Sequence, residues 1–188
     1  MSDDAEILCD RARNGDMAAA SELVAGFYER IFAYFRRLCG DEEDAADLTQ
    51  KTFSKSWNAL ASYERRSTFS GWLHGIAHHV YVDWRRKPNR VDPQSDQWWE
   101  ARAAEGPSPF EDTAERELAT LLYQWADQLE DDQKQVVHLH YYQNLSLNET
   151  AEALGIATST VKYRLRGALD SLRAKAAEPS LFPARRMP

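Results

Sequence analysis

The sequence predicts an all-α protein in which two small helical modules are joined by an extended acidic linker, the C-terminal module being a helix-turn-helix. Apolar residues recur at spacings of three and four over long stretches, as they do on one face of a helix. Glycine and proline, which interrupt helices, number only 8 and 7 among 188 residues. Four of the prolines gather with several acids in residues 88–112, which show little periodicity. These observations place one module at 1–87 and the other at 113–176, with a disordered tail at 177–188.

The first module is expected to contain four helices. Asp16 can cap a long helix that Gly40 ends, and Asp41 can cap the helix that follows. Pro88 stops the last helix, because proline disfavours a helical conformation in the residue before it. With a polar turn from 62 to 68, the expected helices cover residues 3–14, 17–39, 42–60 and 69–86.

The second module is expected to begin with helices at about 110–129 and 131–142. Ser146, with Glu149 three residues later, forms a capping box that begins a third helix. A fourth helix follows after a short turn, and the Thr158 side chain can cap it.

The last two helices carry the spacing of a helix-turn-helix. Ala151 is small where two helices cross, Gly155 lies where the turn needs a positive φ, and Val161 packs the second helix on the first. An ordinary helix pair is the alternative, but the basic second helix favours DNA binding in the major groove. The polar side chains that this helix is expected to expose include Ser159, Thr160, Lys162, Tyr163 and Arg166.

Composition limits the classes of function. The net charge of −7 argues against tight DNA binding by the free chain, because neutralisation of phosphates supplies most of that affinity. Basic residues nevertheless gather locally at 85–90 and 162–175. No apolar run approaches the ~20 residues of a membrane span and the N-terminus is acidic, so no membrane insertion is expected. Cys9 and Cys39 lack metal-ligand spacing and are expected to be buried thiols in a reducing cytoplasm.

The first module contains a second group of candidate functional residues. Asp44, Asp47 and Gln50 share one edge of a helix, which could simply be solvated. The helix at 69–86 mixes aromatic residues with histidines and ends in basic residues, a combination that suits unpaired nucleotides. The alternative is that Trp72, Ile76, Val80 and Trp84 form core at helical spacing, and we expect this of most of them.

Four motifs occur in the order found in one family. They are the Asp-Ala-Ala-Asp-Leu-Thr-Gln helix at 44–50, the Phe-Ser-Gly-Trp-Leu helix that closes in Asp-x-Arg-Arg at 83–86, the acidic linker and the terminal helix-turn-helix. This order resembles the extracytoplasmic-function sigma factors of bacteria, from about residue 20 to residue 175. The resemblance implies binding to core RNA polymerase and to promoter DNA, with the first module melting the minus-10 element and the second recognising the minus-35 element. It also implies contacts with the clamp of the largest subunit and with the flap region, and control by an anti-sigma factor.

The resemblance assigns roles to individual residues of this chain. The residues implied to face polymerase are Asp44, Asp47, Leu48 and Gln50, while Phe53 and Trp57 are expected to hold the core. The loop from Tyr63 to Thr68 would receive an extruded minus-10 base. The implied minus-10 contacts are Arg65, Arg66, Ser67, Trp72, His79, Arg85 and Arg86, the last two with phosphates. The implied minus-35 contacts are Ser159, Thr160, Lys162, Tyr163, Arg164 and Arg166.

Three positions depart from the family pattern. Lys51 stands where an acid is common, His79 replaces a frequent Asn, and Gly167 occupies a place that is often basic. Lys51 weakens the acidic edge, so a phosphate on Thr49 or Thr52 could restore negative charge there. The promoter sequences do not follow from these residues.

Other classes of protein fit the sequence less well. His74 and His78 have the i, i+4 spacing of metal ligands, but no matching third ligand lies nearby, so neither a metal nor a cofactor is expected. His138 and His140 are expected to be incidental. No nucleophile–base set is present, so an enzyme is not expected. A helix-turn-helix activator acting without polymerase is the main alternative, and a decoy that binds polymerase without recognising promoters is another.

Overall fold

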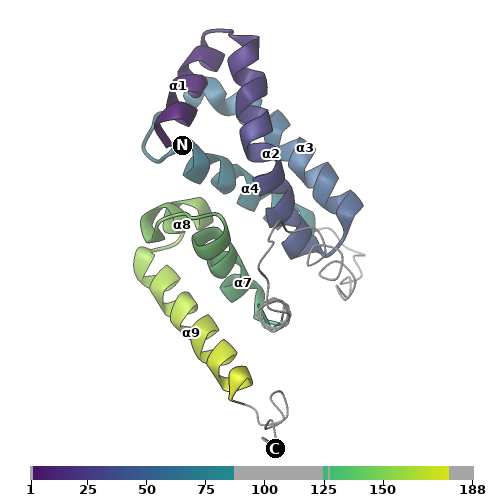
Figure 1. Cartoon of the computed structure of the whole chain (residues 1–188), viewed down its shortest axis with the longest axis vertical. Coiled ribbons are helices and arrows are strands. Elements are labelled where there is room, and N and C mark those ends of the chain that lie inside the picture. The colour runs from purple at the N-terminus through teal and green to yellow at the C-terminus, as the bar shows by residue number, and fades with distance from the viewer. Residues whose placement is uncertain (1, 87–124, 127, 178–188) are drawn as a thin grey trace, which may run out of the picture.

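The computed structural model describes residues 2–86, 125–126 and 128–177. Within these ranges the chain forms helices joined by short turns and contains no strand, which confirms the expected all-α class (Figure 1). None of the helices in these ranges is long and apolar enough to cross a membrane. The expected linker and the expected helix at 110–129 lie almost entirely outside the described residues.

The first module consists of helices α1 (Ser2–Arg13), α2 (Met17–Cys39), α3 (Glu42–Ala59) and α4 (Phe69–Arg85), with a short 3-10 turn, η1 (Leu60–Ser62), after α3. The expected caps are present. Asp16 accepts hydrogen bonds from the backbone of Ala18 and Ala19, and Asp41 accepts one from Asp44. Gly40 ends α2 in the left-handed conformation, with φ of 70°, which a residue with a side chain rarely adopts.

The second module consists of α7 (Asp131–Val137), the π-helical continuation η2 (His138–Tyr142), α8 (Leu147–Leu154) and α9 (Thr158–Ala176). The capping box of Ser146 and Glu149 is present, and Gly155 ends α8 with φ of 64°. The expected cap by Thr158 is wrong. Ala157 occupies the cap position, and the Thr158 hydroxyl donates instead to Asn148 Oδ1 on α8 at 3.1 Å.

The apolar faces of the helices in each module pack together, and the buried side chains of both modules form one continuous core. In the first, α2 packs against α1 and α3, and α4 packs against α3; its most buried large side chains include Ile31, Phe35 and Leu73. In the second, α9 packs against α7 and α8 around Val136 and Val161. Cys9 and Cys39 are buried free thiols, as expected.

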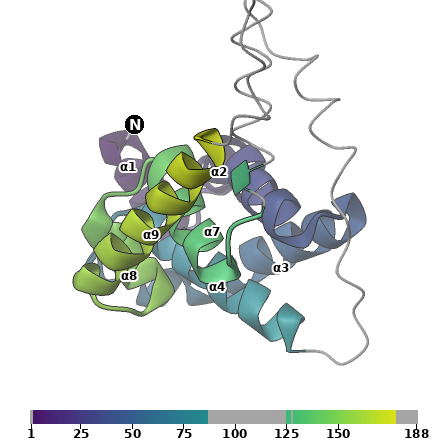
Figure 2. The same ribbon diagram turned by 90° about the horizontal axis from the view of Figure 1, so that it is seen from below.

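The two modules pack directly against each other through α4 and α8 (Figures 1 and 2). The backbones approach so closely that a Cβ added to Gly75 would lie 3.6 Å from Ala153 Cα. The Thr68 hydroxyl, at the start of α4, donates to Glu149 Oε1. We call the whole contact between the two modules the inter-module interface. It brings the loop before α4 close to the helix-turn-helix.

Candidate polymerase and nucleic-acid interfaces

The acidic edge, defined as Asp44, Asp47 and Gln50, lies on the outer side of α3. Asp47 and Gln50 are exposed, and Asp44 is half-buried because Trp84 Nε1 donates to its Oδ1 at 3.0 Å. Lys51 forms an ion pair with Asp47, so it neutralises the most exposed acid of the edge. This edge has the chemistry of a docking site for a basic partner surface, weakened by one internal cation.

Leu48 does not belong to this edge. Its side chain is only 1% exposed and packs in the core, so it cannot face polymerase in this structure. Trp57 shows the opposite error, because the side chain expected in the core is 44% exposed. Phe53 is half-buried and stacks on Tyr28 at 6.2 Å between ring centroids, in keeping with its expected role in packing.

Trp57 lines an apolar groove that the sequence analysis missed. The groove has a volume of about 620 Å³ between α2 and α3, and large exposed side chains line it. The side chains that define this apolar groove are Met17, Val24, Tyr28 and Trp57. Exposed apolar side chains gathered in this way are typical of a binding surface, but their exposure follows from packing and could not be predicted from the sequence. Most of the groove is lined by α2, and Trp57 is its contribution from α3.

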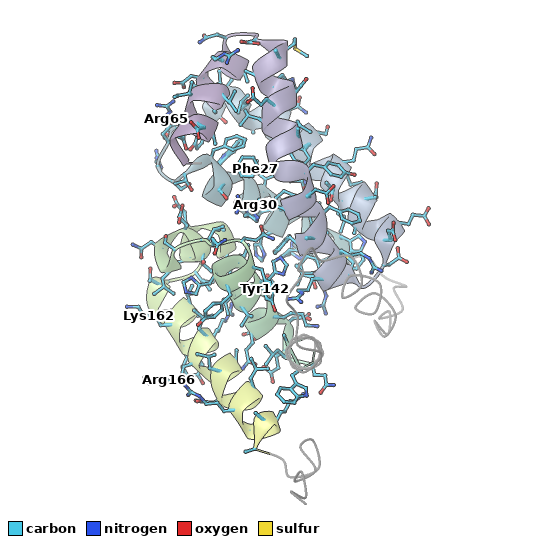
Figure 3. The ribbon with its side chains drawn as sticks, viewed as in Figure 1. Phe27, Arg30, Arg65, Tyr142, Lys162 and Arg166 are labelled. Atoms are coloured by element: carbon cyan, nitrogen blue, oxygen red, sulfur yellow. The ribbon has the colours of Figure 1, made fainter. Side chains whose placement is uncertain are left out.

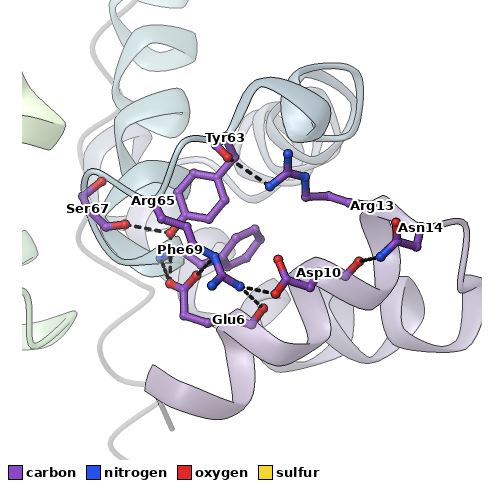
Figure 4. Close-up of polar contacts among 8 residues, drawn as sticks. All are labelled: Glu6, Asp10, Arg13, Asn14, Tyr63, Arg65, Ser67 and Phe69. Atoms are coloured by element: carbon purple, nitrogen blue, oxygen red, sulfur yellow. Dashed lines mark hydrogen bonds and ion pairs between the residues drawn. The ribbon is translucent and has the colours of Figure 1, made fainter.

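The loop of residues 63–68, expected to receive an extruded base, is held by polar contacts to α1 (Figure 4). Arg65 forms ion pairs with Glu6 and Asp10, and Arg66 forms one with Glu64. Arg66 is the more exposed of the two arginines, so it is better placed to meet a phosphate. The Ser67 carbonyl oxygen accepts a hydrogen bond from the Tyr63 hydroxyl at 2.7 Å.

Aromatic rings form the floor beneath this loop. Trp72 is half-buried and lies 5.0 Å from Tyr63 and 5.6 Å from Phe69 between ring centroids. Phe69 in turn contacts Phe27 of α2 edge to face. His79 lies two turns further along α4, exposed, with its Nδ1 2.7 Å from the Gly75 carbonyl oxygen. Trp72 and His79 therefore lie on the helix that follows the loop, with Trp72 packed beneath it.

One of the two basic residues at the end of α4 forms an ion pair with the second module. Arg85 forms an ion pair with Asp131, at the start of α7, and its guanidinium also lies over the Tyr81 ring. Arg164 of α9 forms an ion pair with the neighbouring Asp132, with 3.0 Å between Nε and Oδ2. Two carboxylates of α7 thus neutralise one expected DNA contact from each module. Arg86 is exposed.

The helix α9 presents the side chains expected to recognise duplex DNA. Ser159, Lys162, Tyr163 and Arg166 are exposed, Tyr163 to 79%, whereas Thr160 and Arg164 are half-buried. Figure 3 shows Lys162 and Arg166 on the side of α9 that faces away from α7.

Gly167 lies on the side of α9 that faces α7. A Cβ at this position would lie 3.0 Å from Gln133 Nε2 of α7, so the end of the Gln133 side chain would have to shift by a few tenths of an ångström to admit a larger residue.

The interpretation of His138 as incidental is wrong. His138 is buried, its Nε2 lies 2.9 Å from Gln143 Nε2, and its ring contacts Tyr34 of the first module at 5.4 Å. The Tyr34 ring also contacts buried His74, and Gln143 exchanges hydrogen bonds with Arg30 of α2. Two histidines and a tyrosine therefore form part of the inter-module interface. His140 is half-buried, with its Nδ1 2.7 Å from the Leu145 carbonyl oxygen.

Both interface histidines are held neutral. Burial, reinforced by Arg30, lowers the pKa of His74 to about 4, although hydrogen bonding to Ser70 opposes that shift. Burial, with Arg37 and His74 adding to it, also lowers the pKa of His138 well below its ordinary value. Within the described residues, no group of three or more His, Cys, Asp or Glu side chains could hold a metal ion.

The depressed pKa of His74 predicts that acid weakens the folded structure. The unfolded histidine takes up a proton near pH 6.5, whereas the folded one does so near pH 4. The unfolded state therefore binds more protons in this range, and stability is complete above pH 6.5 and falls as pH drops toward 4. We expect His74 to lower the free energy of unfolding by about 2 kcal/mol between pH 7 and pH 5.

Urea unfolding of His74→Gln at both pH values checks this expectation. The variant should lose less stability on acidification than the wild type does, and the exposed His79→Gln controls for the removal of a histidine. An unchanged pH dependence in His74→Gln would contradict the assignment.

Thr49 and Thr52 are poor candidates for phosphorylation in this structure. Both side chains are fully buried, because α3 packs against both α2 and α4. Their hydroxyls donate to the carbonyl oxygens of Ala45 and Leu48, one turn earlier in α3. A kinase could not reach either hydroxyl without opening the module, which corrects the expectation that a phosphate could be added there.

A two-module helical protein with an exposed basic recognition helix and a separate acidic docking edge has the architecture of a transcription factor that binds both DNA and a protein. Residues 23–91 match the Sigma-70 region 2 family and residues 125–174 match Sigma-70 region 4.

Among curated proteins, the chain is 32% identical to the RNA polymerase sigma factor YlaC of Bacillus subtilis over 78% of this chain and 86% of YlaC. It is 31% identical to the ECF sigma factor SigE of Mycolicibacterium smegmatis over 85% of this chain, although the match spans only 63% of SigE.

Solved structures share the fold. CnrH, in complex with the cytosolic domain of CnrY, superposes with a TM-score of 0.67 at 24% identity, covering 92% of this chain and 97% of CnrH. The sigma factor RpoE of Bartonella quintana, in complex with the anti-sigma factor NepR, superposes with a TM-score of 0.64 at 19% identity, over 84% of this chain and 97% of RpoE. The chain belongs to the extracytoplasmic-function family of RNA polymerase sigma factors. It is an alternative sigma factor that directs RNA polymerase to promoters.

Proposed function

We propose that the first module docks on the clamp of the largest polymerase subunit through the acidic edge and the apolar groove. Asp47 and Gln50 supply charge and hydrogen bonding, and Tyr28 and Trp57 supply apolar area. The exposure of both components on the α2–α3 pair is the observation that carries this proposal. In this scheme the second module contacts the flap region, and the polymerase supplies all catalytic chemistry in the cytoplasm.

The same module then melts and recognises the minus-10 element. An extruded base enters the loop at 63–68, as enzymes and other proteins that act on single bases accept a base out of the stack. Trp72 and the neighbouring aromatic rings support the loop, and His79 lies along the melted strand. Arg66 and Arg86, both exposed, bind phosphates.

The second module recognises the minus-35 element with α9 in the major groove. Arg166 is the best candidate for a base contact, because it is exposed and a guanidinium can donate two hydrogen bonds to a guanine edge. Ser159, Thr160, Lys162 and Tyr163 contribute contacts around it. Arg164 becomes available to DNA when its ion pair with Asp132 opens.

Replacing Arg166 by alanine tests this proposal. We expect open-complex formation to fall and the minus-35 preference to relax, by ~1–3 kcal/mol, if Arg166 contacts a base edge through two hydrogen bonds. Arg86→Ala should instead weaken all promoters alike, as the loss of a phosphate contact does. Transcription from a promoter library by polymerase carrying each variant measures both effects. If Arg166→Ala keeps the wild-type sequence preference, α9 does not recognise the minus-35 element through this residue.

We also propose control by an anti-sigma factor. A solved relative with the same fold, RpoE of Bartonella quintana, is found in complex with one. Phosphorylation of α3 is the weaker mechanism, since Thr49 and Thr52 are buried.

A further inference from the structure

Helix α1 lies outside the residues that match Sigma-70 region 2, which begin at residue 23. It nevertheless packs against α4 and η1, on both sides of the loop at 63–68. Figure 4 shows three of its side chains, Glu6, Asp10 and Arg13, directed at the loop or bonded to it. The chemistry of these contacts shows what α1 does for the loop.

Glu6 links the two ends of the loop through hydrogen bonds. Its Oε1 accepts a hydrogen bond from the backbone N–H of Phe69, the first residue of α4, at 2.8 Å. The same oxygen lies 2.9 Å from the Tyr63 hydroxyl, which is also 2.7 Å from the Ser67 carbonyl oxygen. One hydroxyl proton serves one of these acceptors at a time, so Tyr63 links Glu6 to the far end of the loop.

Arg65 has an unusual backbone conformation that α1 stabilises. Its φ of 56° lies in the left-handed region, which residues other than glycine adopt rarely and keep only when their surroundings hold them there. The guanidinium forms ion pairs with Asp10 and Glu6 and donates to the Glu6 carbonyl oxygen at 3.2 Å. These contacts point the side chain back onto α1.

Arg13 fixes the start of the loop. It donates to the carbonyl oxygens of Ala61 and Tyr63 at 3.2 and 3.3 Å. Three residues on one face of α1, separated by four and three positions, therefore contact the loop or the residues at its two ends.

We propose that Glu6 and Asp10 are positioning residues for minus-10 recognition, which hold the loop at 63–68 through Arg65 in the shape that accepts an extruded base. The inference rests on the function proposed above for that loop. It also changes the role of Arg65 from a direct contact with the minus-10 DNA to a tether that holds the loop on α1. Residues before the Sigma-70 region 2 match thereby determine how well one base is distinguished from another.

The two roles of Arg65 predict opposite results in polymerase carrying the full chain. The measurement is open-complex formation on a matched promoter and on promoters changed at the single extruded base. If Arg65 is a tether, Arg65→Gln and Asp10→Asn each lower the preference for the matched base about tenfold, and the double variant is no worse than either. If Arg65 binds a phosphate, Arg65→Gln weakens all promoters equally and Asp10→Asn strengthens them, which would overturn the proposal.

Further variants separate positioning from folding. Asp10 is half exposed, so the isosteric Asn leaves packing intact, and Asp10→Glu should restore the base preference. Glu22→Gln, an exposed carboxylate on α2, is the matched control and should keep it. If wild-type polymerase complexes form without any preference at this base, the proposed function of the loop is wrong. If the preference exists and Asp10→Asn retains it, only the role of α1 is wrong.

Discussion

Asp47→Arg is expected to abolish binding to core RNA polymerase while leaving the fold intact. Asp47 is exposed and already beside Lys51, so an arginine there would place two cations where a basic clamp surface must approach. Like charges facing each other across an interface are strongly unfavourable, and we expect affinity to fall at least about a hundredfold. Lys51→Glu should act in the opposite direction, since it removes the cation that now neutralises Asp47.

Quantitative binding of labelled core polymerase to the purified variants measures this effect. Glu152→Arg makes the same change of net charge on an exposed site of α8 and controls for it. Wild-type affinity in a folded Asp47→Arg variant would show that the acidic edge is not the docking surface.

Gly75→Phe is expected to open the inter-module interface. The structure holds the modules in direct contact, whereas elements named minus-10 and minus-35 lie roughly 80 Å apart along duplex DNA at ~3.4 Å per base pair. The modules must therefore separate before both can bind a promoter. A phenyl ring at position 75 cannot fit against Ala153, since even a Cβ would lie 3.6 Å from its Cα.

Opening the modules should also release Arg85, in the first module, from Asp131 of α7 in the second module. Small-angle scattering should show an expanded chain for Gly75→Phe, and its promoter binding without polymerase should rise. Gly26→Phe, at a helical glycine with no atom within 4 Å of an added Cβ, is the matched control. A variant as compact as the wild type would contradict the interface described above.

Local chemistry made the helix boundaries predictable from the sequence. Asp16, Gly40 and Gly155 act within a few residues of themselves, so their roles follow from the neighbouring sequence. The prediction that Thr158 caps its helix was wrong, because its hydroxyl donates to Asn148 on the preceding helix instead. The competing partner is close in space only after the turn at Gly155 has formed.

Which face of a helix is buried was harder to predict. Leu48 and Trp57 both lie on α3, and the spacing of its apolar residues fits more than one choice of buried face. Only the packing of α3 against α2 and α4 decides that Leu48 is buried and Trp57 exposed. The same packing buries Thr49 and Thr52. His138 becomes interior through contact with Tyr34, more than a hundred residues earlier, and no local pattern indicates such a contact.

Run-off transcription with purified core polymerase and a genomic promoter library, with and without this chain, tests the central claim most directly. We expect the chain to produce transcripts from a discrete set of start sites that share minus-10 and minus-35 elements, and Asp47→Arg to eliminate them. A transcript pattern that does not change when the chain is added would contradict its role as a promoter-directing subunit of polymerase.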